Sequence, residues 1–163
     1  MIVANEWGSL KFEDEHSDMG YWNPVYEGHV DVVLENTSTH PIHIYESSNM
    51  WGYDIVRLEW QADGKTGTVS RVPVAAWSAN APSVITLAPG GATVRTVQLD
   101  KSWEGWPDFR SGMRLTLRAV YEQRAAGLRD ITSPGTERRF ASGWVGKVSS
   151  APVTLEINGY FGH

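Results

Sequence analysis

Apolar and polar residues alternate along residues 113–122, which is the longest regular pattern in the chain. Met113, Leu115 and Leu117 fall on one side of an extended backbone, whereas Arg114 and the other polar residues fall on the opposite side. A period of two is the pattern of a β-strand with one buried face. We therefore expect this stretch to be the central strand of an antiparallel sheet.

The same alternation recurs in shorter stretches on both sides of this strand, separated by turn residues. Asn, Ser, Pro and Gly cluster at 36–39, 63–64 and 88–91, where their side chains or backbone freedom favour turns. Short strands separated by such turns predict an all-β antiparallel sandwich of about seven to nine strands, with long loops at both ends and no substantial helix. The further strands are expected at 28–35, 41–46, 54–62, 68–74, 83–87, 92–99, 143–148 and 152–157.

The length of 163 residues indicates one sandwich domain over residues 28–163. Residues 1–27 form a less regular N-terminal segment with a candidate edge strand at 9–12. The chain has no cysteine, so disulfides and thiolate metal sites are excluded. A chain of this size can bury a core large enough to fold without such links.

The start of the chain has no basic and apolar signal-peptide pattern, and no run approaches the roughly 20 apolar residues of a membrane span. We expect no membrane span. We expect a cytoplasmic protein if the chain is complete, and a periplasmic or secreted one if a signal peptide has been removed.

The net charge of −5 is unevenly distributed. Residues 1–63 hold twelve acidic and two basic residues, whereas residues 64–163 hold seven acidic and twelve basic residues. This asymmetry could steer a charged partner, or the two halves could largely cancel across the sandwich. The net acidity argues against nucleic acid as the main partner.

Several short motifs lie at the turns and strand ends of the predicted sandwich. They are Leu-Glu-Asn-Thr-Ser at 34–38, Leu-Ala-Pro-Gly at 87–90, Gly-Met-Arg at 112–114, Ala-Val-Tyr at 119–121, Trp-Val-Gly at 144–146 and Ser-Ala-Pro-Val at 150–153. With these motifs the chain resembles bacterial immunoglobulin-like or fibronectin-III-like modules, including the intracellular proteinase inhibitor type, over roughly residues 28–157. The resemblance implies an immunoglobulin-like sandwich that binds proteins or accompanies a catalytic domain, and it implies no catalytic residues.

Eight tryptophans are many for a chain of this size. Trp60 and Trp144 fall in predicted strands, so we expect them in the core. Five other aromatic residues fall in loops 47–53, 75–82 and 100–112, which would share one end of the sandwich if successive strands alternate in direction. These residues could form a binding surface for a protein or a sugar, or they could fold back to cap the core. The candidate partner-binding residues are Trp51, Tyr53, Trp77, Trp103 and Trp106.

No stretch carries a catalytic or metal-binding motif. Gly-x-Ser-x-Gly, His-Glu-x-x-His and phosphate-binding glycine loops do not occur in the sequence. The acidic run at 13–18 lacks the spacing of a calcium loop, and His40 and His43 would face opposite sides of a strand. We therefore predict a protein without catalytic activity, bound metal or cofactor.

Three functions remain open from the sequence. The first is a non-catalytic protein-binding sandwich, such as an inhibitor or an immunity protein that blocks an enzyme or toxin. The second is a carbohydrate-binding module that uses loop tryptophans, and the third is a structural or accessory domain of a larger assembly. The asymmetric charge and the loop aromatics favour the first.

Overall fold

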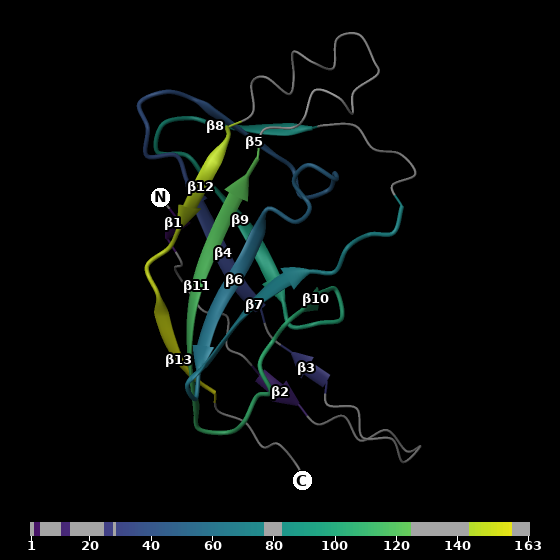
Figure 1. Ribbon diagram of the computed structural model, residues 1–163. Coiled ribbons are helices and arrows are strands. Elements are labelled where there is room, and N and C mark those ends of the chain that lie inside the picture. The colour runs from purple at the N-terminus through teal and green to yellow at the C-terminus, as the bar shows by residue number, and fades with distance from the viewer. Residues whose placement is uncertain are drawn as a thin grey trace.

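The computed structural model describes residues 2–3, 11–13, 25–27, 29–76, 83–124 and 144–157. These residues form antiparallel strands, and none of them lies in a helix (Figure 1). The predicted all-β class is therefore confirmed. No helix within these ranges is long and apolar enough to cross a membrane.

The described ranges contain nine strands of four or more residues, in agreement with the predicted seven to nine, and four shorter strands. The strands are β1 (Ile2–Val3), β2 (Lys11–Glu13), β3 (Val25–Glu27), β4 (His29–Glu35), β5 (Ile42–Tyr45), β6 (Val56–Ala62), β7 (Lys65–Arg71), β8 (Val84–Leu87), β9 (Ala92–Gln98), β10 (Trp103–Glu104), β11 (Met113–Gln123), β12 (Gly146–Ser149) and β13 (Val153–Ile157).

Strand β11 occupies the centre of the largest sheet, as its length and alternation predict. It pairs with β6 along one edge, and with β13 and then β12 along the other. Its partner changes at Ser150, whose hydroxyl accepts a hydrogen bond from the Ala119 N–H at 3.0 Å. The Ser150 N–H in turn donates to the Ala119 carbonyl at 2.9 Å. Ser150 therefore fills the gap between the two partner strands and leaves no orphan donor on Ala119.

The sheets face each other in two layers. In Figure 1, β6, β7 and β11 cross the front of the molecule, while β4 and β9 run behind them. The rear sheet has the order β1-β4-β9, the front sheet has the order β10-β7-β6-β11-β12 with β13 also on β11, and β5-β8 and β2-β3 form two-stranded ribbons. Inward residues of both layers form one apolar cluster, which includes Val32 and Val97 from the rear and Leu58, Val69 and Leu115 from the front. This is the packing of a β-sandwich.

The β6–β7 connection is a two-residue hairpin at the Asp-Gly pair predicted as a turn. Asp63 and Gly64 have φ angles of 49° and 75°, the left-handed conformation that such hairpins require and that glycine adopts without strain. The short hairpin starts β7 at Lys65, three residues before the predicted start. The polar residues 65–67 hide the alternation there, so turn length and not hydrophobic pattern sets this boundary.

The turn between β4 and β5 is organised by Asn36, which is only 2% exposed. Its amide nitrogen donates to the carbonyl oxygens of His40 at 2.8 Å and Leu87 at 2.9 Å. Its side-chain oxygen accepts hydrogen bonds from the Ser38 N–H at 3.0 Å and from the Ser38 hydroxyl at 2.7 Å. The predicted Asn turn is confirmed, with the Asn36 side chain buried and its neighbours Thr37 and Ser38 exposed.

Candidate functional site

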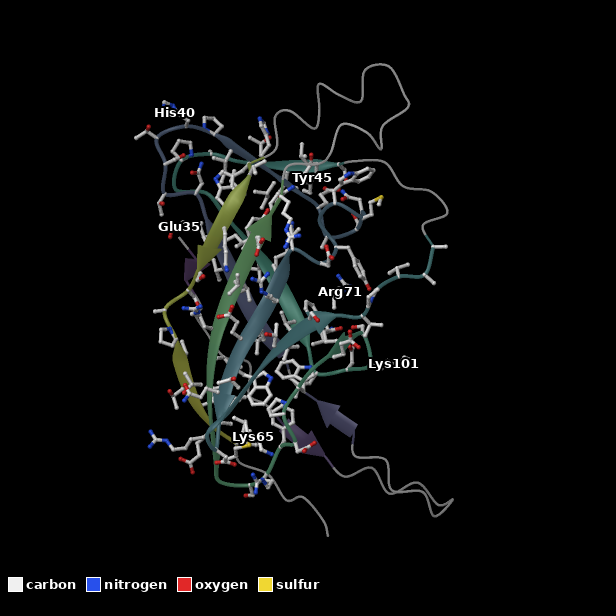
Figure 2. The ribbon with its side chains drawn as sticks, viewed as in Figure 1. Glu35, His40, Tyr45, Lys65, Arg71 and Lys101 are labelled. Atoms are coloured by element: carbon white, nitrogen blue, oxygen red, sulfur yellow. The ribbon has the colours of Figure 1, made fainter. Side chains whose placement is uncertain are left out.

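A groove of about 340 Å³ opens between the edges of the two sheets. Its lining comes from the end of β7, from β10, from β9 and from the loop that follows β5. The residues that define its chemistry are Tyr53, Arg71, Val94, Arg95, Thr96 and Trp103. We call this feature the arginine groove. Figure 2 labels Arg71, the last residue of β7.

Arg71 is held at the mouth of the groove by two aromatic rings. Its guanidinium carbon lies 4.2 Å from the centroid of the Tyr53 ring and 5.7 Å from the centroid of the Trp103 ring. Each contact is in the range of a cation–π interaction, worth roughly 0.5–2 kcal/mol according to exposure. The Arg71 Nε atom is buried and has no hydrogen-bond partner in the described part of the chain. The rings therefore fix the position of a cation whose donors are not fully used.

Tyr53 is placed by the loop after β5, and that loop is placed by Asn49. The buried Asn49 side chain donates to the Ser83 carbonyl at 3.0 Å and accepts from the backbone N–H groups of Trp51 and Gly52, also at 3.0 Å. A Cβ atom on Gly52 would overlap a backbone carbonyl oxygen, so only glycine fits there without a shift. The Tyr53 hydroxyl donates to the Val72 carbonyl at 3.1 Å, which ties this loop to the residue after Arg71.

Arg95 enters the groove from β9. One of its terminal nitrogens donates to the Tyr45 carbonyl at 2.8 Å, but its buried Nε atom has no partner among the described residues. Burial lowers the pKa of Arg95 below its ordinary value, and the charges of Tyr121 and Glu46 offset this only in part. An arginine guanidinium nevertheless keeps its proton in proteins at neutral pH. The groove therefore holds two cations, and no described acidic residue lines it.

Each arginine occupies an inward position where the strand pattern calls for an apolar residue. Arg71 follows Val69 by two residues on β7, and Arg95 precedes Val97 by two residues on β9; both valines are 0% exposed. Residues two apart on a strand share a face. The two arginines therefore continue the inner faces of the two sheets outward to the rim of the core, where the sheets separate.

Strand β9 also presents an unpaired backbone edge to the groove. Of the described strands, only β4 pairs with it. The Asn36 N–H donates to the Gly91 carbonyl at 2.9 Å, which sets the phase of the β4–β9 ladder. Because hydrogen-bonded pairs alternate in an antiparallel ladder, the backbone groups of Val94, Thr96 and Gln98 point away from β4. These three residues line the groove.

The candidate aromatic residues lie in different surroundings. Tyr53 and Trp103 meet at Arg71, although Trp103 is only 7% exposed and belongs to the core cluster. Trp51 lies in the same loop as Tyr53 and is half-buried, outside the groove lining. Trp106 packs against the core and against Phe109, with ring centroids 5.9 Å apart. Trp77 lies outside the described residues.

The structure also tests where the sequence placed three other tryptophan positions, in the core or in a loop. Trp60 and Trp144 pack against the core as predicted, although both remain partly exposed. Trp103 lies in the short strand β10, within a stretch predicted to be loop, and pairs there with Arg71. In the part of the chain that the structure describes, no group of three His, Asp or Glu residues is placed to hold a metal ion.

Sequence reasoning that looked for aromatic loop residues missed Arg71 and Arg95. Their signal in the sequence is a charged residue in the inward phase of an otherwise alternating strand. No protein-family model, curated protein or solved structure matches this chain. The immunoglobulin-like resemblance and its functional implications therefore stay predictions.

Proposed function

We propose that this protein is a non-catalytic β-sandwich that binds another protein at the arginine groove. In the form the sequence favours, this binding inhibits the partner, which would be an enzyme or a toxin. The observation that carries the proposal is the combination of side chains in the groove. Arginine, tyrosine and tryptophan are the residue types most enriched at the energetic hot spots of protein interfaces, and here Arg71 contacts one tyrosine and one tryptophan.

The free edge of β9 supports a protein partner over a sugar. An extended segment of a partner can add to an unpaired strand edge through backbone hydrogen bonds, while alternate side chains enter pockets beside it. The outward backbone groups of Val94, Thr96 and Gln98 offer such an edge along the groove. Sugar stacking would require a broad exposed ring, whereas Trp103 is 7% exposed.

The chemistry of the lining favours binding over catalysis. The described lining residues include hydroxyl, amide, aromatic and guanidinium groups, but no carboxylate, imidazole or thiol. General acid–base and nucleophilic mechanisms draw mainly on those three groups, with a second group to activate the nucleophile. Two arginines that keep their charge are suited instead to hold a partner of opposite charge.

The proposal is tested by affinity capture from lysate and medium of the source cells, with quantitative mass spectrometry. The wild-type protein is compared with Arg71→Met, which removes one of the two groove cations, and with Arg114→Met, the same substitution at an exposed position on β11. A protein retained by the wild type and by Arg114→Met, but depleted at least tenfold with Arg71→Met, supports the proposal. No captured protein, or equal capture by all three, overturns it.

A further inference from the structure

The arginine groove contains two cations that form no salt bridge with a described residue. Arg71 and Arg95 come from different sheets yet line one groove, and each has a buried Nε atom without an acceptor. The salt bridges of the described residues involve other arginines, namely Arg57, Arg110, Arg118 and Arg124. Arg71 and Arg95 are thus the inward arginines, and unlike those four they form no ion pair with a described residue.

Buried donors without acceptors are rare in folded proteins, because each unsatisfied group costs free energy. The Nε atoms themselves lie buried beneath the groove, but a ligand that brings oxyanion acceptors to the exposed parts of the two guanidinium groups would neutralise their charge. The Arg71 guanidinium lies within cation–π distance of two aromatic rings, and its N–H donors lie in the guanidinium plane. The edge of this plane matches the two coplanar oxygens of a carboxylate.

We infer that the groove recognises an acidic side chain, aspartate or glutamate, on an extended segment of the partner protein. The carboxylate is held by Arg71 and Arg95 while the segment pairs with the free edge of β9. This inference rests on the proposed function, and it adds the chemical class of the partner segment. No covalent step is involved, since the carboxylate only accepts hydrogen bonds from the two guanidinium groups.

The experiment uses the full ¹⁵N-labelled chain and a blocked peptide, acetyl-Val-Thr-Glu-Thr-Val-amide, followed by nuclear magnetic resonance. The Nε–H signals of the two arginines report on the acidic side chain, and the backbone amides of Val94, Thr96 and Gln98 report on strand addition. We expect both sets to shift and saturate together. The otherwise identical glutamine peptide should bind about tenfold more weakly or worse, because it loses charge-assisted hydrogen bonds.

Lysine variants of the protein and a phosphoserine peptide provide two further tests of the inference. Arg71→Lys keeps the charge but loses the planar fork, so the glutamate peptide should bind it severalfold more weakly, whereas Arg114→Lys should bind like the wild type. A phosphoserine peptide that binds much more tightly than the glutamate peptide would overturn the choice of a carboxylate. Equal binding of the glutamate and glutamine peptides, or no shift of the Nε–H signals, would overturn the inference as a whole.

The outcomes also separate this inference from the proposed function. If the acidic peptide has no effect but a captured protein still depends on Arg71, the acidic specificity is wrong and the protein-binding function stands. If the acidic peptide binds in the groove but no protein is captured, the proposed function fails and the carboxylate site stands.

Discussion

Replacing Asn36 by alanine should destabilise the fold more than any nearby polar substitution. The buried amide of Asn36 joins the β4–β5 turn to β8 through hydrogen bonds with His40, Leu87 and Ser38. Each such bond contributes a net 0.5–1.5 kcal/mol, by the usual rough range, and a buried carbonyl left without a donor costs about 1–3 kcal/mol. Solvent can replace the partners of the more exposed groups, so we expect a total loss of about 3 kcal/mol.

A loss of this size is a large share of the 5–15 kcal/mol that typically stabilises a domain, by order of magnitude. It is measured by urea unfolding of Asn36→Ala, followed by tryptophan fluorescence and circular dichroism. The midpoint should fall while the slope with urea stays near that of the wild type. Asn36→Asp keeps the acceptor but loses both donors, so it should be destabilised by about 2 kcal/mol or more.

The matched control is Thr37→Ala, which changes an exposed neighbour in the same turn and should alter stability by less than about 0.5 kcal/mol. A loss below about 1 kcal/mol for Asn36→Ala would refute the reasoning. It would mean that water satisfies the Leu87 carbonyl as well as the amide does.

Three further substitutions test other parts of the structure. Gly52→Ala places a Cβ atom against a backbone carbonyl oxygen, so urea unfolding should show a loss of about 1–3 kcal/mol, and an unchanged midpoint would contradict the close approach. Ser150→Ala should cost about 1–2 kcal/mol by the same assay, whereas the exposed Ser149→Ala should cost little, and equal effects would rule out the bridging role of the hydroxyl. Burial raises the pKa of Tyr121, so stability is full below the ordinary tyrosine pKa near 10 and should fall as the pH rises above it. Tyr121→Phe should reduce this alkaline loss of thermal stability, and an identical pH profile would show that Tyr121 is not its source.

Much of the fold follows from local patterns in the sequence. The alternation at 113–122 predicts the central strand, which extends from Met113 to Gln123. Strand β9 and the hairpin at Asp63 and Gly64 also match their predicted positions, because period-two burial and turn chemistry act over a few residues. Local reasoning fails at β10, where only two residues pair and no alternation can develop.

The arginine groove could not be predicted in the same way. Arg71 and Arg95 are 24 positions apart and lie in sheets that do not pair with each other. Which sheet edges adjoin is decided by long-range packing, and a two-residue pairing of β10 with the end of β7 brings Trp103 to Arg71. The sequence shows only that each arginine stands at a strand position where the alternation expects an apolar, inward-facing residue. Such a position is a conflict between the local pattern and the chemistry of the side chain. Such conflicts are expected where function and not stability selects the residue.

A role of Arg71 in the fold and a role in partner binding predict opposite effects of its substitution on stability. If Arg71 serves the fold, Arg71→Met should lower stability, because a cation held by two rings is lost. If it serves a partner, the same change should leave stability within about 1 kcal/mol of the wild type or raise it, because methionine still packs on Tyr53 and Trp103 and a buried unpaired donor is removed.

Urea unfolding and partner or peptide binding are therefore measured on the same Arg71→Met preparation. Unchanged or increased stability together with at least tenfold weaker binding would assign Arg71 to recognition. A loss of stability above about 2 kcal/mol would assign Arg71 to the fold. A loss of that size exceeds what an exposed cation–π contact supplies, so the side chain would also support the structure around it. The unpaired Nε atom would then be a cost of holding the guanidinium near the two rings, and it would no longer support a ligand in the groove.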